Sequence, residues 1–133
     1  MGQRSYYKRL FVVAAVWNWG AAILFFFWSS QVFTMLKMDP LNHPGIMQLA
    51  MGLVFAIGMG HYWVSKDITA NRDLVKVGII AKSFAALVLI FHYAVGNFHV
   101  LLALCGGVDL LFVILFFEFL RTGKNFESVA AAL

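Results

Sequence analysis

Lys82 and Asp109 carry opposite charges inside two long apolar stretches. Charged side chains at such positions are the best candidates in this chain for binding a ligand or carrying a proton. Lys82 interrupts the stretch 75–95, and Asp109 lies near the middle of the stretch 100–120. A charge at the centre of a membrane helix costs about 2.5–3.5 kcal/mol on insertion scales, so such residues face the protein interior and pair with one another. An ionisable residue at this depth is a candidate site for binding a ligand or carrying a proton.

Asn18 and His61 are expected to join Lys82 and Asp109 in one polar layer. A tight turn joins the stretches that carry the two charges, so the helices are antiparallel neighbours. At a rise of about 1.5 Å per residue, Lys82 and Asp109 reach similar depths. Asn18 lies at about the same depth, with His61 nearer the predicted cytoplasmic boundary. The layer has two interpretations: a neutralised pair that fixes helix order, or a site for a ligand or proton.

His43, His92 and His99 all fall toward the opposite side of the membrane. Three imidazoles near one surface could bind a metal ion, but their spacing matches no standard ligand motif. We therefore interpret them as ordinary interfacial histidines and predict no metal site. His61 and His92 lie toward opposite faces, which argues against a haem held between them. No cofactor is predicted.

Small residues form two ridges of the kind that lets membrane helices approach closely. Their spacing is four residues, which places each set on one helix face. The ridges are consistent either with packing inside one bundle or with a homodimer face. The residues are Gly52, Ala56 and Gly60 in one stretch and Ala103 and Gly107 in another.

The composition is that of a membrane protein. The chain has 133 residues, of which 62% are hydrophobic and 12% charged, and its mean hydropathy is +0.85. A soluble domain of this size has too much surface to hide so many apolar side chains. The net charge of +4 is better explained by basic residues flanking membrane spans than by nucleic-acid binding. The single cysteine, Cys105, is interpreted as a small packed hydrophobe.

Four apolar stretches each approach the roughly 20 residues that a spanning helix needs. They cover about 10–30, 46–65, 75–95 and 98–120. The sequence therefore predicts an all-α fold: one antiparallel, up-down-up-down four-helix transmembrane bundle over residues 1–133.

Basic residues predict the orientation of this bundle. They cluster before the first stretch, around the second connection and after the last stretch, whereas the first connection has only Lys37. By the positive-inside rule, both termini and the second connection lie in the cytoplasm. The residues concerned are Arg4, Lys8, Arg9, Lys66, Arg72, Lys76, Arg121 and Lys124.

Several short motifs spread over most of the chain carry a family resemblance. They are Trp17-Asn18-x-Gly20, Gly58-x-Gly60-His61-Tyr62, Asp67-x-x-x-Asn71-Arg72, Gly78-x-x-x-Lys82 and Gly107-x-Asp109-Leu110-Leu111-Phe112. With them the chain resembles small bacterial four-span membrane proteins of unassigned activity, and more loosely the DoxX-like group. The resemblance implies a four-helix fold and a bacterial inner membrane. It supplies no substrate.

Three functions fit these observations. The first is a non-enzymatic binding or accessory protein that uses the polar layer to hold a lipid, a quinone-like molecule or a larger membrane complex. The second is a small transporter or proton-linked channel, which needs a homodimer because four helices leave little room for a pathway. The third is an intramembrane enzyme using Lys82, Asp109 and His61. The chain has no Walker motif, dinucleotide loop, zinc-hydrolase motif or nucleophile elbow, so we place the enzyme last.

Overall fold

The computed structural model of the chain describes residues 2–123, 126 and 132, and these residues form four α-helices and no strand. The helices are α1 (Gln3–Met35), α2 (Pro44–Lys66), α3 (Arg72–Ala94) and α4 (Val100–Thr122). All four are long and apolar enough to cross a membrane, which fits a small multi-pass membrane protein. The predicted all-α, four-helix class is confirmed. Lys124, one of the flanking charges, lies outside the described residues.

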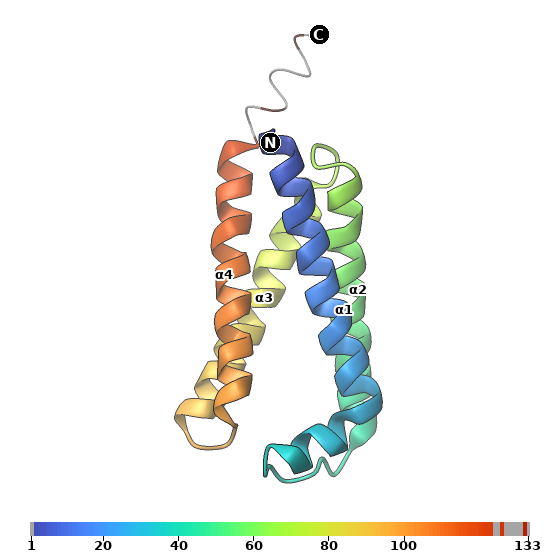
Figure 1. Cartoon of the computed structure of the whole chain (residues 1–133), viewed down its shortest axis with the longest axis vertical. Helices are drawn as coiled ribbons and strands as arrows, with labels where there is room; N and C mark the ends of the chain where they lie inside the picture. The colour runs from blue at the N-terminus through green and yellow to red at the C-terminus, as the bar shows by residue number, and fades with distance from the viewer. Residues whose placement is uncertain (1, 124–125, 127–131, 133) are drawn as a thin grey trace.

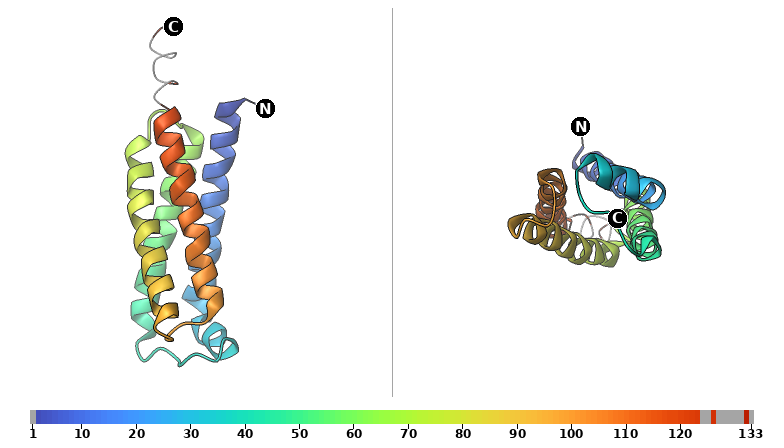
Figure 2. Two further views of the ribbon diagram at one scale, coloured as in Figure 1. Left: turned by 90° about the vertical axis from the view of Figure 1, so that its left-hand side faces the viewer. Right: turned by 90° about the horizontal axis from the view of Figure 1, so that it is seen from below.

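The helices form two hairpins, α1 with α2 and α3 with α4, joined by contacts between α2 and α3. In Figure 1 the start of α1, the α2–α3 connection and the end of α4 lie at one end of the molecule. We call this the closed end, because the hairpins lie side by side there. Toward the opposite end they diverge, as Figures 1 and 2 show. We call that end, with the α1–α2 and α3–α4 connections, the open end.

Aromatic side chains hold the closed end together. Tyr7 and Phe11, one turn apart on α1, meet Phe116 and Phe119 of α4, and all four are fully buried. The ring centroids of Phe11 and Phe116 are 4.9 Å apart, and those of Phe11 and Phe119 are 5.0 Å apart. Each such ring buries roughly 150–250 Å². Two aromatic positions on each helix are therefore enough to join α1 to α4 at this end.

Polar contacts also cross the closed end. The Tyr7 hydroxyl donates to Oε1 of Glu118 at 3.1 Å. Nη2 of Arg72, at the start of α3, donates to the Leu120 carbonyl of α4 at 2.7 Å. The first bond joins the two hairpins beside the aromatic contacts, so both of these would have to break for the hairpins to separate here, whereas the second bond holds α3 to α4 within one hairpin.

Helix α1 differs most from the predicted spans. It runs from residue 3 to 35 instead of 10 to 30, and Trp28 has non-helical dihedral angles of φ −126° and ψ 23°. Beyond this kink the helix turns across the open end (Figure 1). No proline is present, but Ser29 and Ser30 follow directly, and serine pairs are a common site of kinks. The other three helices match the predicted spans within three residues at every bound.

The α3–α4 turn explains how two long helices become neighbours. Gly96 has φ +82°, a left-handed conformation that glycine adopts at little cost. The amide of Asn97 donates to the carbonyl of His92 at 2.8 Å. This bond closes the end of α3 and reverses the chain within a few residues, which places Lys82 and Asp109 on facing helices.

Candidate functional site

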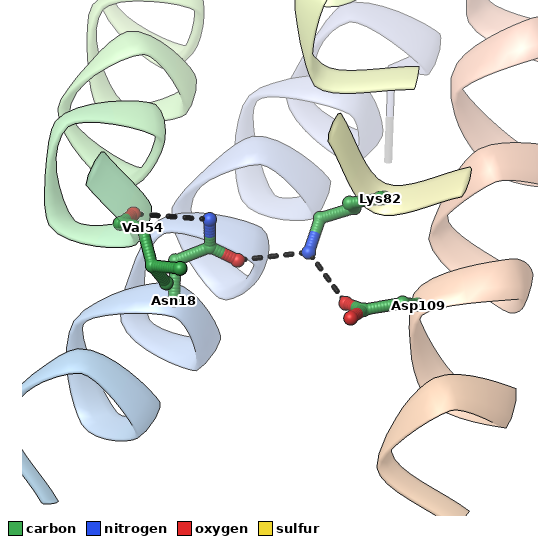
Figure 3. Close-up of polar contacts among 4 residues, drawn as sticks. All are labelled: Asn18, Val54, Lys82 and Asp109. Atoms are coloured by element: carbon green, nitrogen blue, oxygen red, sulfur yellow. Dashed lines mark hydrogen bonds and ion pairs between the residues drawn. The ribbon is translucent and has the colours of Figure 1, made fainter. Parts of the chain in front are cut away.

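Lys82 joins three helices through its amino group. Its Nζ donates to Oδ1 of Asp109 at 2.7 Å and to Oδ1 of Asn18 at 2.8 Å, as Figure 3 shows. Nδ2 of Asn18 in turn donates to the carbonyl of Val54 on α2 at 3.3 Å. We call Asn18, Lys82 and Asp109 the polar trio. The trio links the two hairpins, since Asn18 belongs to one and the ion pair to the other.

The polar trio is buried. Asn18 is 6% exposed, Lys82 3% and Asp109 9%. Nζ of Lys82 also lies 4.8 Å from the ring centroid of Phe112, where an aromatic face attracts a cation. Lys82 and Asp109 together carry no net charge, so the bundle interior holds two charges without holding an unbalanced one.

One oxygen of the Asp109 carboxylate is unused. Oδ1 accepts from Lys82, whereas Oδ2 receives no hydrogen bond from any described residue. The side chain of Asp109 keeps 12% of its surface exposed. A carboxylate oxygen is a strong acceptor, so the trio has one acceptor position that the described residues leave open.

Gly106 lets α4 lie close to α3 beside the ion pair. A Cβ at residue 106 would lie 3.3 Å from the carbonyl oxygen of Ala86 and 3.3 Å from Cβ of Leu89. Gly58 does the same between α2 and α1, because a Cβ there would lie 2.7 Å from the Trp19 ring. The predicted ridges included neither glycine. One pattern indicated the contact at Gly106: Gly106 and Asp109 are three residues apart and therefore share a helix face.

A large cavity extends between the hairpins from the polar trio toward the open end. Its volume is about 820 Å³, and all four helices line it. Asn18 and Asp109 contribute polar atoms, while almost all of the remaining surface is apolar. Phe33, beyond the kink in α1, lines it too, so the kinked segment forms part of the wall. Other apolar lining residues are Val16, Leu24, Phe25, Met51, Leu89 and Leu102.

A second hollow of about 170 Å³ reaches the trio between α2 and α3. Asn18 and Asp109 line both spaces, whereas Lys82 lines only the smaller one. The cation is thus screened from the large cavity by its two acceptors. A molecule in the large cavity would meet the carboxylate of Asp109 and the amide of Asn18.

His61 does not join the polar trio. The side chain is 1% exposed, and neither ring nitrogen has a hydrogen-bond partner among the described residues. Its ring packs against Phe116 at 5.0 Å between centroids, and Gly78 makes room for it, since a Cβ there would lie 2.5 Å from Cε1 of His61. The structure therefore brings three of the four predicted site residues together and places His61 in the aromatic contacts of the closed end.

The other histidines occupy helix ends. Nδ1 of His99 accepts from the amide of Leu101 at 3.2 Å and caps α4. Nδ1 of His92 lies 3.1 Å from Nδ2 of Asn97, and His43 directly precedes α2. Within the part of the chain that the structure describes, no three His, Cys, Asp or Glu residues are grouped closely enough to hold a metal ion.

The predicted small-residue ridges face outward in part. Gly52, Ala56 and Gly107 are exposed, and an added Cβ at Gly52 or Gly107 would meet nothing within 4 Å. Gly60 is buried, and a Cβ added there would lie 3.9 Å from the side chain of Leu74, whereas Ala103 is half-buried. A side chain at Gly52 or Gly107 would therefore meet no other helix of this bundle, and the homodimer face stays a prediction.

Comparison with known proteins yields no relative: no family model, curated protein or solved structure matches the chain. The resemblance to small four-span bacterial membrane proteins stays a prediction. The polar trio and the cavity beside it are therefore the features that bear on function.

Proposed function

We propose that this is a small integral membrane protein that binds a lipid-like molecule, non-enzymatically, in the large cavity, with the polar end of that molecule at the trio. One observation carries the proposal: an almost wholly apolar cavity of about 820 Å³ meets Asn18 and Asp109 at one end. Sites for small molecules typically measure about 300–1,000 Å³ and combine apolar walls with a few polar groups that orient the ligand.

The contacts of Lys82 favour binding over catalysis. A lysine that acts as a nucleophile or base needs a free, neutral amine near the substrate. Here Nζ donates to both Asp109 and Asn18, and Lys82 does not line the large cavity. The amino group organises the acceptors around it, and Asp109 is the group that a ligand would contact.

Charge distribution supports an orientation with the closed end in the cytoplasm, and the resemblance of the sequence motifs is the basis for proposing a bacterial inner membrane. Arg4, Lys8, Arg9, Lys66 and Arg72 belong to the segments that meet at the closed end, whereas Lys37 belongs to the open end. Cytoplasmic connections carry such an excess of Lys and Arg. Reporter fusions at the N-terminus and within residues 37–43 would test the orientation by showing which side each faces.

Photo-crosslinking tests the binding function. A dodecyl alcohol with a diazirine in its chain would be added to the purified protein in nanodiscs, and the labelled residues identified by mass spectrometry. We expect label on residues that line the large cavity. Two single variants place a ring in that cavity, Ala21→Phe and Ala50→Phe, and each should remove this label. Ala94→Phe adds the same ring at an exposed position outside the cavity and should not. Label that is spread evenly over lipid-facing residues in every variant would refute the proposal.

A homodimeric transporter is the second candidate, because the hairpins that line the cavity lie together at the closed end and diverge at the open end. Transport would require the closed end to open, breaking the contacts of Tyr7 with Glu118 and of Phe11 with Phe119. Cysteines placed at Tyr7 and Glu118, in a Cys105→Ala background, would be joined by a bis-maleimide crosslinker, which is long enough to span the two positions and would hold that end shut. Binding that survives the crosslink while flux into proteoliposomes stops would favour transport, and unchanged binding without any flux would favour the binding protein.

A further inference from the structure

We infer that the polar end of the bound molecule is a neutral hydrogen-bond donor, such as the hydroxyl of a single-chain alcohol, and that the site rejects anionic and donor-free head groups. The inference rests on the proposed function and specifies its ligand. It follows from which hydrogen-bonding positions of the polar trio are already occupied and which remain open.

The trio offers the large cavity an acceptor. Oδ1 of Asn18 accepts from Lys82, and one of the two N–H groups on Nδ2 of Asn18 donates to Val54. Two donor positions of Lys82 are taken by Asn18 and Asp109, and Lys82 does not line this cavity. Oδ2 of Asp109, which has no partner among the described residues, is the position that a ligand can satisfy (Figure 3).

Charge selects against an anionic head group. Lys82 and Asp109 are balanced, so a bound carboxylate or phosphate would place a second negative charge beside Asp109 in an apolar cavity. Interactions between charges are strong where water is excluded, and an unpaired buried charge costs several kcal/mol in general. A hydroxyl adds no charge, and its hydrogen bond to a carboxylate is of the stronger, charge-assisted kind.

Hydrogen bonding selects against an ether or ester. Such a group carries acceptors only, so beside Asp109 it would leave Oδ2 unsatisfied. A buried polar group without a partner costs about 1–3 kcal/mol, which corresponds to about 5- to 150-fold in affinity. An alcohol and its methyl ether have nearly the same shape, so comparing them isolates the single hydrogen bond.

Three diazirine probes with the same dodecyl chain test the inference: the primary alcohol, its methyl ether and the carboxylate. Each would be crosslinked to the protein in nanodiscs, and cavity labelling counted relative to the Ala21→Phe variant, which corrects for partitioning into the bilayer. We expect the alcohol to label cavity residues about tenfold more than the ether or the carboxylate at neutral pH.

Asp109→Asn should reverse this preference. The new amide oxygen can still accept from Lys82, which leaves the amide N–H groups in place of Oδ2. The cavity would then offer a donor, and the ether should label at least as well as the alcohol. If the lone charge of Lys82 prevents this variant from folding, the double variant Lys82→Met with Asp109→Asn presents the same amide without an unpaired charge.

The outcomes separate this inference from the proposed function. Equal cavity labelling by the three probes, or a preference for the carboxylate or ether in the wild type, would overturn the inference while leaving binding intact. A folded amide variant that still prefers the alcohol would overturn it too. Absence of cavity label from every probe would instead refute the binding function, because the cavity would then hold no more than the chains of bulk lipid.

Discussion

Nζ of Lys82 on α3 lies 2.7 Å from Oδ1 of Asp109 on α4, and Asp109 also lines the large cavity between the two hairpins. Asn18 connects this ion pair to the other hairpin. On one side of the pair, aromatic side chains fill the closed end, and on the other side the large cavity begins. The pair therefore balances two buried charges and also forms the boundary between a packed region and a hollow one.

Removing one member of the ion pair should cost far more than removing both. Lys82→Met leaves a buried carboxylate, and Asp109→Leu leaves a buried ammonium. Breaking a buried pair in this way costs about 3–5 kcal/mol, whereas replacing both partners by apolar residues is often neutral. The free energy of unfolding of the two single variants and the double variant, measured in detergent micelles, checks this expectation.

The double variant also separates stability from recognition. It should be close to the wild type in stability, yet cavity labelling by the alcohol probe should fall because the acceptor is gone. A double variant whose loss of stability equals the sum of the two single losses would show that the residues do not stabilise one another.

Asn18→Leu should destabilise the protein by about 1–3 kcal/mol, because one buried N–H of Lys82 loses its acceptor. The variant should also weaken the link between the hairpins, since Asn18 joins Lys82 to the Val54 carbonyl. Thr34→Val is a matched control: it removes an exposed 2.9 Å bond to the Ser30 carbonyl, where water can replace the lost partner. Equal losses in both variants would argue against a special role for Asn18.

The contact between Lys82 and Asp109 could be predicted from the sequence. A tight turn joins the two helices, and a helix rises by a fixed distance per residue, so counting from the turn gives both depths. Asn18 could be placed by depth as well. His61 could not, because depth does not fix the direction of a side chain around the helix axis, and this ring packs against Phe116 instead.

The cavity could not be predicted, because apolar periodicity does not separate core from surface in a membrane helix. Val13 and Val16 look like core residues, yet they are 57% and 58% exposed. The kink at Trp28 also had no strong signal, since neither proline nor glycine is near it. The cavity depends on how the hairpins pack, and the bulky rings at the closed end contribute to that packing.

The α2–α3 connection should lose stability at acidic pH because of Asp67. Its carboxylate accepts from the Thr69 hydroxyl at 2.7 Å and from the amides of Thr69 and Ala70 at 2.9 and 3.1 Å. These bonds, chiefly those from Thr69, hold the pKa of Asp67 below its ordinary value of 3.8. A pKa that is lower in the folded state means stability that is present above the unfolded value and lost as the pH falls through the folded value.

The amide NMR shifts of Thr69 and Ala70 would report this titration. They should stay constant from neutral pH to about the ordinary pKa of a free carboxyl and change only below it. Asp67→Asn keeps one acceptor oxygen but cannot titrate, so its shifts should not change in this range. A wild-type transition at or above the ordinary value would contradict the bonding described for Asp67.

Gly78→Ala should destabilise the closed end through His61. The new Cβ would lie 2.5 Å from Cε1 of His61, and forcing extra atoms into a packed core costs about 1–3 kcal/mol. In a His61→Ala background the ring is absent, so the same substitution should cost little. Gly107→Ala is the control, because its Cβ meets nothing within 4 Å and alanine favours a helix by up to about 1 kcal/mol. Unfolding free energies of the four variants of this cycle measure the coupling.

His61→Phe then decides whether His61 belongs to the site. Both ring nitrogens are buried without a partner among the described residues, and the surroundings are aromatic. A phenyl ring removes two unsatisfied polar atoms at similar volume, so we expect unchanged or higher stability. Cavity labelling by the alcohol probe should also persist. If a folded His61→Phe protein no longer takes the label, His61 belongs to the binding site, because the substitution removes only its ring nitrogens.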